Sequence, residues 1–218
     1  MSAAAAVVAG IVHVVDDDIA FQTAIARVLV AAGHKPRLYA SAQEYLGADD
    51  SEGPACVLLD LRMPGPSGLE LQGALARRDN AHPVIFISGH GDIPSTVRAM
   101  RDGAVDFLTK PVPTATLLAT IGRALTQDLQ RQQWLVRVSD LRQRYAALTP
   151  RERQVMAGVI GGRLNKQICY TLHAAERTVK THRARVMEKM QVRSVAELVR
   201  LAEELEAAGT RLTAMPEE

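Results

Sequence analysis

IVHVVDDDIAF, residues 11–21, sets an unbroken apolar run directly before three aspartates and the start of a helix. An apolar run without polar alternation is typical of a strand that is covered on both faces of a parallel sheet. Two carboxylates about 5 Å apart repel by on the order of 3 kcal/mol at an effective dielectric of about 20. Asp18 is placed to cap the helix, so Asp16 and Asp17 need a positive partner. The alternative is that all three are capping or solvated loop residues.

The same pattern recurs along the first half of the chain. Further apolar runs occupy 56–60, 84–88 and 106–109, with a weaker one at 37–40, and helical stretches are predicted at 19–32, 42–47, 68–78, 95–102 and from 114 onward. Strands that alternate with helices predict an α/β fold with a five-stranded, doubly wound parallel sheet. Ligands of such sheets bind at the carboxyl ends of the strands, near the switch point between strands 1 and 3. At that edge the sequence places Asp16, Asp17 and Asp60, with Ser88 and Lys110 beside them.

These side chains suit a divalent metal and a phosphoryl group. Mg²⁺ prefers oxygen ligands, commonly one or two carboxylates with waters and phosphate oxygens. Asp17 and Asp60 can bind it directly, Asp16 through water, and the backbone carbonyl of Arg62 adds a ligand. Asp60 can form an acyl phosphate, with Lys110 pairing with the growing negative charge and Ser88 donating to a phosphate oxygen. Taken singly, Ser88 and Lys110 are more simply read as polar loop residues.

The length, cysteine content and charge of the chain limit its domain number, disulfides and partners. A chain of 218 residues is comfortable for two domains, and two distant cysteines, Cys56 and Cys169, form no disulfide framework. The apolar N-terminus lacks a positive region and is too short to span a bilayer, so the cytoplasm is expected and a membrane is not. Residues 1–127 hold 10 Lys/Arg against 13 Asp/Glu, or −3, whereas residues 128–218 hold 16 against 11, or +5. The basic half indicates a polyanionic partner.

The sequence from residue 114 onward predicts helices. From 114 to 146 a last domain helix is predicted to run into a long helical connector, whose stripe from Trp134 to Leu148 fits either a coiled coil or a helix packed on a neighbour. Helices follow near 150–161, 165–172, 176–190 and 194–208, and the tail from Gly209 is expected to fray. Thr149, Pro150 and Glu152 predict a capped helix start. The turn at 173–175 has helix-turn-helix spacing.

The helix at 176–190 turns Val179, Val186 and Met190 toward a core and a basic face outward. Such a face suits the major groove of DNA, although a solvated basic helix is the plainer alternative. Lys166, Arg183, Lys189 and Arg193 suit phosphates. The predicted DNA-contacting residues are Lys166, Arg177, Thr178, Lys180, Thr181, Arg183, Ala184, Arg185 and Lys189.

VVDDD (14–18), LLDLRMPGPSG (58–68), FISGHGDIPSTVRAM (86–100) and GAVDFLTKPV (103–112) resemble the receiver domain of bacterial two-component response regulators. The resemblance covers about residues 10–127 and implies a CheY-like fold. It also implies that Asp60 is the phosphoacceptor, with Asp16 and Asp17 as the acidic pair that binds Mg²⁺. Ser88 and Phe107 would be the switch residues and Lys110 the invariant lysine, preceding a cis bond to Pro111. Many members carry Tyr where Phe107 stands, so a switch hydroxyl is missing here.

LTPRERQVM (148–156), NKQI (165–168) and RTVKTHR (177–183) resemble the four-helix DNA-binding domain of the LuxR/FixJ/NarL group over about 148–203. Cys169 departs from the usual alanine, and Ala175 from the usual capping serine, at a cost of about 1 kcal/mol. The resemblance implies a receiver at 1–127, a helical linker at 128–146 and a helix-turn-helix domain at 147–218. Implied partners are a sensor histidine kinase, double-stranded DNA and, after phosphorylation, a second copy of the chain; RNA polymerase is a further candidate.

Two other classes of protein compete with this interpretation. A Mg²⁺-dependent phosphatase with an aspartyl-phosphate intermediate would share Asp60, but it needs a general acid two residues later, where Arg62 stands. The chain is therefore expected to catalyse only its own phosphoryl transfer and dephosphorylation. A helical output domain that binds protein is the other alternative, and the basic face of 176–190 favours DNA instead.

Overall fold

The computed structural model describes residues 8–48, 53–77, 81–89 and 93–215, so residues 90–92 of the motif at 86–100 lie outside it. The chain divides into two compact units, Met1–Gln132 and Gln133–Glu218. No helix among the described residues is long and apolar enough to cross a membrane.

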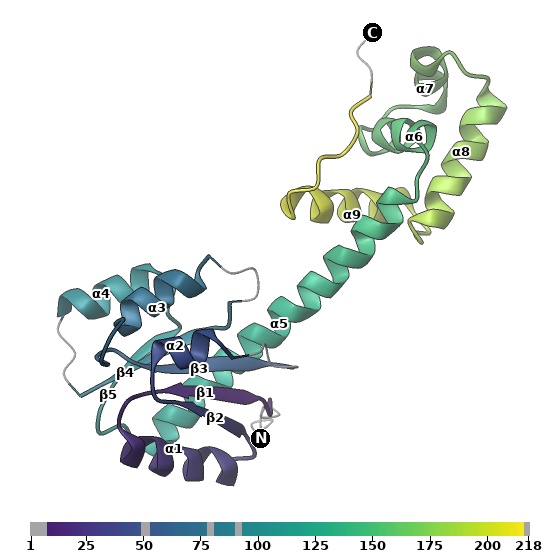
Figure 1. Cartoon of the computed structure of the whole chain (residues 1–218). Coiled ribbons are helices and arrows are strands. Elements are labelled where there is room, and N and C mark those ends of the chain that lie inside the picture. Colours follow the sequence, from purple (N-terminus) through teal and green to yellow (C-terminus); the bar gives the residue numbers. More distant parts are fainter. Residues whose placement is uncertain (1–7, 49–52, 78–80, 90–92, 216–218) are drawn as a thin grey trace. The chain divides into compact units, whose positions relative to one another are not determined.

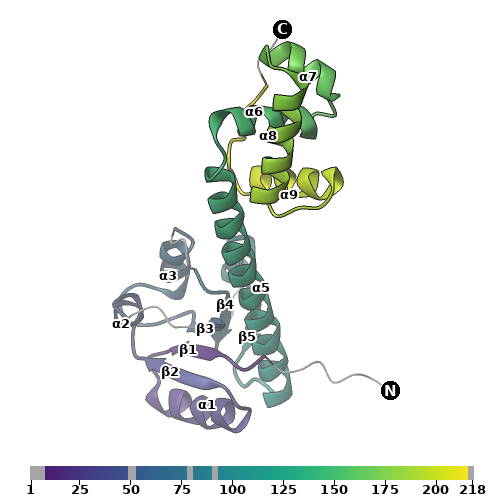
Figure 2. The same cartoon turned by 90° about the vertical axis from the view of Figure 1, so that its right-hand side faces the viewer.

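The first unit is built on a parallel sheet with the strand order β2-β1-β3-β4-β5, which confirms the predicted fold class (Figures 1 and 2). Its strands are β1 (Ile11–Val15), β2 (Lys35–Tyr39), β3 (Ala55–Asp60), β4 (Val84–Ser88) and β5 (Asp106–Thr109). Its helices are α1 (Ile19–Ala31), α2 (Ala42–Leu46), α3 (Gly68–Leu75), α4 (Ile93–Arg101) and the first part of α5 (Thr114–Ala146).

The sheet has one apolar core on each face. Leu58 of β3 packs with α1 and α5, whereas its neighbours Val57 and Leu59 pack with α2, α3 and α4. Every residue of β1, β3 and β4 is buried, which explains their unbroken apolar runs, because each side chain alternately enters one core or the other. The two edge strands are partly polar: Lys35 and Arg37 are exposed along β2, and β5 carries Asp106 and Thr109.

The second unit contains α6 (Pro150–Ile160), α7 (Asn165–Leu172), α8 (Glu176–Lys189) and α9 (Val195–Ala207), with the last part of α5. Leu141, Tyr145 and Leu148 lie in one core with residues of α6 to α9. The later part of the predicted stripe, from Leu141 to Leu148, therefore packs on its own unit, whereas Trp134 is exposed. Residues 128–146 are shared between the units, since Asp128 is buried in the first and Tyr145 in the second.

The helix ends have the predicted capping, but the C-terminal tail differs from the prediction. Thr149 and Glu152 form a capping box at the start of α6, and Ala175 gives α8 no side-chain cap. The expectation that the tail frays is wrong for the described residues. Thr213 N donates to the Tyr145 hydroxyl oxygen at 2.7 Å, and Leu212 and Met215 pack on the core. These tertiary contacts hold the segment in place, although its sequence has no helical or strand periodicity.

Candidate functional site

The carboxyl edge of the sheet gathers the predicted polar residues of the first unit. Asp16 follows β1, Asp60 ends β3, Ser88 ends β4 and Lys110 follows β5. The backbone N–H of Lys110 donates to the carbonyl of Ser88 at 2.8 Å, which aligns the last two segments. The peptide bond between Lys110 and Pro111 is cis, as the resemblance implied.

The ammonium of Lys110 joins two buried carboxylates. Its Nζ lies 2.6 Å from Asp16 Oδ2 and 3.0 Å from Asp60 Oδ1. Asp16 is 1% exposed and Asp60 6%. Burial raises the pKa of Asp16, although Lys110 and the backbone N–H of Asp18 oppose the rise. Burial alone would lower the pKa of Lys110, but its hydrogen bonds to Asp16 and Asp60 outweigh this and raise it. Lys110 is therefore a positive partner for Asp16 and Asp60, and these contacts do not include Asp17.

The three consecutive aspartates are divided among different tasks. Asp16 holds Lys110 and accepts from the N–H of Asp18 at 2.9 Å. Asp18 caps α1, accepting from Ala20 N and Phe21 N, as predicted. Asp17 is exposed beside them. Only Asp17 of the three thus combines an exposed carboxylate with no part in capping.

The loop after Asp60 approaches the acceptor closely. Arg62 N donates to Asp60 Oδ2 at 2.7 Å. At Gly68, the first residue of α3, a Cβ would lie 2.4 Å from the carbonyl oxygen of Asp60 and 3.0 Å from the Phe86 ring. Glycine is therefore required there because the start of α3 lies directly against the end of β3.

Replacing Gly68 with alanine should destabilise the protein by about 1–3 kcal/mol, the usual cost of overpacking. Gly73 is the matched control on the same helix, because no described atom lies within 4 Å of its Cβ position. Alanine there should stabilise α3 by about 0.5–1 kcal/mol. Urea unfolding followed by circular dichroism measures both changes. Equal stabilities for the two variants would contradict this packing.

The donor set fits Mg²⁺. Among the described residues no three His, Cys, Asp or Glu side chains form a ready metal site. Mg²⁺ does not require three, since it commonly takes one or two carboxylates and keeps several waters. Asp17 and Asp60 offer two carboxylates at the same edge of the sheet, and all the candidate donors are oxygens.

The two candidate switch residues lie on the neighbouring strands β4 and β5, where Ser88 is in register with Thr109 and Phe107 with Phe86. Ser88 is 2% exposed. Phe107 in β5 is half-buried, and its ring stacks on Phe86 with the centroids 6.0 Å apart. Ser88 ends β4 and its carbonyl accepts the backbone hydrogen bond from Lys110, and Phe107 lies in the strand that precedes Lys110.

The basic face of α8 is arranged as predicted. Val179 and Val186 are buried on its inner side. Its exposed residues include Arg177, Thr178, Lys180, Thr181, Ala184 and Arg185. Lys180 pairs with Glu176 one turn earlier at 2.9 Å, and both line a shallow hollow with Arg177, Thr181 and Ala184.

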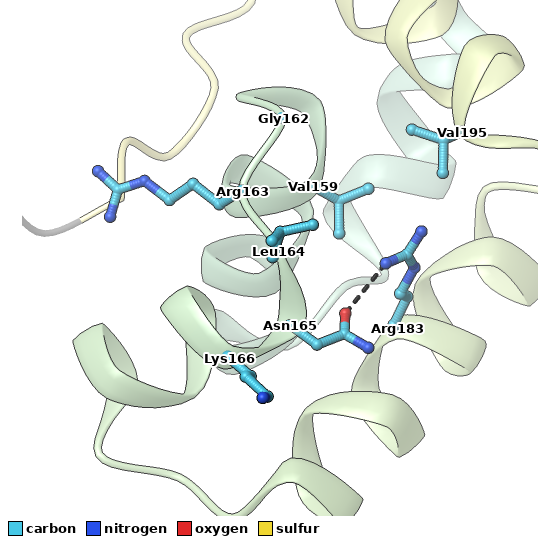
Figure 3. Close-up of a pocket in the computed structure, with 8 residues that line it drawn as sticks. All are labelled: Val159, Gly162, Arg163, Leu164, Asn165, Lys166, Arg183 and Val195. Atoms are coloured by element: carbon cyan, nitrogen blue, oxygen red, sulfur yellow. Dashed lines mark hydrogen bonds between the residues drawn. The ribbon is translucent and has the colours of Figure 1, made fainter.

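The start of α7 adds a second basic region. Figure 3 shows Lys166 and Arg183 around one pocket, with Arg183 Nη1 donating to Asn165 Oδ1 at 3.0 Å. Arg163 lines the same pocket and was not predicted; its only sequence signal was a lone cation after a Gly-Gly turn. Its guanidinium points away from Lys166 and Arg183, and Arg163 Nη1 donates to Thr171 Oγ1 at 3.2 Å, so the pocket brings together only the cations of Lys166 and Arg183.

Lys189 does not join these basic groups. Its Nζ lies 2.6 Å from Oε2 of the buried Glu152 and 3.1 Å from the carbonyl oxygen of Ala147. The Lys189 ammonium is thus paired within the protein, and its phosphate contact stays a prediction. Helical periodicity could not reveal this pairing, because Glu152 reaches Lys189 from α6.

Comparisons with known proteins agree with both units. Family profiles match the response regulator receiver domain over residues 12–122 and the bacterial regulatory proteins of the luxR family over 146–202. Nodulation protein W of Bradyrhizobium diazoefficiens is 43% identical over 195 residues, or 89% of this chain and 86% of that protein. Transcriptional regulatory protein FixJ of the same organism is 41% identical over 88% of this chain and 94% of its own length. The solved structure of response regulator StyR matches with 43% identity and a TM-score of 0.80, covering 90% of this chain and 99% of that one.

Proposed function

The chain belongs to the transcriptional response regulators that join a receiver domain to a LuxR-type DNA-binding domain, and from this premise we propose that phosphorylation of Asp60 switches it. The observation that carries the proposal is the Lys110 ammonium held between Asp16 and Asp60. In this arrangement a cation already faces the acceptor carboxylate. A sensor histidine kinase is the proposed donor.

In the proposed reaction, a carboxylate oxygen of Asp60 attacks the phosphorus, and the bond from phosphorus to the donor breaks with its electrons leaving on the donor. Lys110 pairs with the phosphoryl oxygens, and Ser88 donates its hydroxyl to one of them. The proposed metal ligands are Asp17, Asp60 and the Arg62 carbonyl, with Asp16 bound through water. Mg²⁺ bound there would supply neutralisation of the phosphoryl charge. No turnover of an external substrate is proposed beyond this self-phosphorylation and its reversal.

The proposed response is pairing of two copies through α4. Ile93, Val97 and Met100 recur at helical spacing along α4 and are 80%, 43% and 44% exposed. The α4 surface packs next to β5, which carries Phe107. An exposed apolar stripe beside the switch residue suits an interface that forms only in the phosphorylated state.

Replacing Val97 with glutamate should weaken phosphorylation-dependent dimerisation by more than about tenfold, because burying an unpaired charge costs several kcal/mol. The measurement is sedimentation velocity after incubation with acetyl phosphate and Mg²⁺. Val30→Glu is the matched control, since Val30 is a 62%-exposed valine on α1. Wild-type behaviour of Val97→Glu, or equal loss in both variants, would exclude α4 as the interface.

The proposed output is binding of double-stranded DNA by α7 and α8. Arg177, Thr178, Lys180, Thr181, Ala184 and Arg185 would face base edges or the groove. Lys166 and Arg183, which line one pocket, would contact phosphates. A two-fold dimer would read half-sites about one DNA turn apart. RNA polymerase remains a candidate partner.

DNA affinity should fall steeply with salt, because each neutralised phosphate releases counterions. Lys166→Gln should make the slope of log affinity against log salt shallower by about 1. Fluorescence anisotropy with a mixed-sequence duplex measures the slope without a known operator. Lys35→Gln, on the exposed edge strand of the first unit, is the control and should leave it unchanged. A flat salt curve for the wild type would exclude these phosphate contacts.

A further inference from the structure

Phe21 lies against the cation of the phosphoacceptor site. The Lys110 Nζ is 3.9 Å from the centroid of the Phe21 ring. This is well inside the distance of about 6 Å at which an ammonium is attracted by the face of an aromatic ring. Phe21 stands in the first turn of α1, where its backbone N–H donates to the side chain of Asp18 at 3.0 Å. The third aspartate thus fixes the backbone that carries the ring.

We propose that Phe21 is a positioning residue for phosphoryl transfer, acting by holding Lys110 at Asp60; this inference rests on the proposed role of Asp60. An ammonium has three N–H donors on a flexible four-carbon stem. The carboxylates of Asp16 and Asp60 take hydrogen bonds from Lys110, and the ring covers another side of it. Phe21 therefore restricts the Lys110 head group to the edge of the sheet where the phosphoryl group arrives.

Hydrogen bonds to the carboxylates alone would not keep the Lys110 ammonium in one position. Asp16 and Asp60 are also proposed to hold Mg²⁺, Asp16 through water, so a bound metal would draw on the same carboxylates as Lys110. The attraction of the ring for the ammonium does not use those carboxylates. Phe21 keeps Lys110 in place whether or not the carboxylates are engaged elsewhere.

Phe21 is also half-buried beside the core between the sheet and α1, so its packing must be separated from its effect on Lys110. Leucine keeps an apolar side chain but has no ring quadrupole, whereas tyrosine keeps the ring. Fluorinated phenylalanines at position 21 keep the shape of the ring while progressively weakening the negative face that attracts a cation.

The first experiment measures the rate of phosphoryl addition from acetyl phosphate and Mg²⁺ by intact mass, in the full chain. Phe21→Leu should react about fivefold more slowly, whereas Phe21→Tyr should stay within about twofold of the wild type. The rate should fall steadily as fluorine atoms are added to the ring. In a Lys110→Met background, Phe21→Leu should cause no further loss. Equal rates across the fluorinated series, or an undiminished Phe21 effect without Lys110, would overturn the proposal.

A second experiment separates this inference from the role of Asp60. The Lys110 side-chain NH₃⁺ signal in nuclear magnetic resonance reports the order of the head group in the unphosphorylated protein. Its order parameter should be lower in Phe21→Leu than in the wild type and restored in Phe21→Tyr; no difference among the three would overturn the proposal. Failure of the wild type to accept a phosphoryl group would instead overturn the role of Asp60 while this readout still tests Phe21.

Discussion

Replacing Lys110 with methionine should slow phosphoryl transfer to Asp60 by about 10²-fold, the usual loss when one preorganised electrostatic group is removed from a transition state. Methionine keeps an unbranched side chain of similar length and removes the ammonium, with its charge and its three N–H donors. The buried carboxyls of Asp16 and Asp60 lose their cation. Since burial already raises the pKa of Asp16, we expect protonation at this edge of the sheet rather than unfolding.

The rate of adduct formation with acetyl phosphate and Mg²⁺, followed by intact mass, measures this effect. Lys35→Met is the matched control, because Lys35 is exposed on the edge strand β2. It should react at the wild-type rate. Lys110→Met reacting as fast as Lys35→Met would remove Lys110 from the mechanism.

Replacing Lys189 with methionine should destabilise the second unit by about 3 kcal/mol, because it leaves the buried Glu152 carboxylate without its cation. Glu152 is 1% exposed, and its Oε2 also accepts from the N–H of Thr149 at 2.8 Å. Lys180→Met is the matched control on the same helix, since Lys180 is exposed and pairs only within α8 in the described structure. It should cost no more than about 0.5 kcal/mol. Fluorescence of Trp134, the only tryptophan, follows urea unfolding of this unit.

The same ion pair predicts an acid sensitivity. Burial alone would raise the pKa of Glu152, but the hydrogen bonds from Lys189 and Thr149 outweigh it and lower the pKa below its ordinary 4.5. A carboxyl with a lowered pKa in the folded state adds stability above its unfolded pKa and loses it as the pH falls through the folded value. Lys189→Met should remove this loss on acidification. Identical stability profiles for Lys189→Met and Lys180→Met would mean that the pair contributes nothing.

The buried parallel strands are the part of this fold that the sequence predicts best. The predicted ranges 11–15 and 84–88 coincide with β1 and β4, since burial on both faces forces continuous apolar runs. The range 106–109 coincides with the partly buried edge strand β5. The edge strand β2 begins two residues earlier than predicted, because its exposed Lys35 and Arg37 interrupt such a run. Local caps were equally readable: Asp18 and Thr149 act within a few residues of their own positions.

Contacts between elements far apart in the sequence could be predicted only where a rule of sheet topology applies. The meeting of Asp16, Asp60 and Lys110 follows from the common edge of parallel strands. No such rule connects Lys189 with Glu152, or Phe21 with Lys110. On a single helix Lys189 reads as one more basic residue, and Phe21 reads as one more core residue. Their roles depend on which side chains the tertiary fold brings opposite them.

The most direct test of the central proposal is the intact mass of the full chain after incubation with acetyl phosphate, with and without Mg²⁺, beside Asp60→Asn. Asparagine keeps the shape of the acceptor but cannot form the acyl phosphate. We expect one phosphoryl group on the wild type, only with Mg²⁺, and none on the variant. No adduct on the wild type, or the same adduct on Asp60→Asn, would contradict the proposed switch.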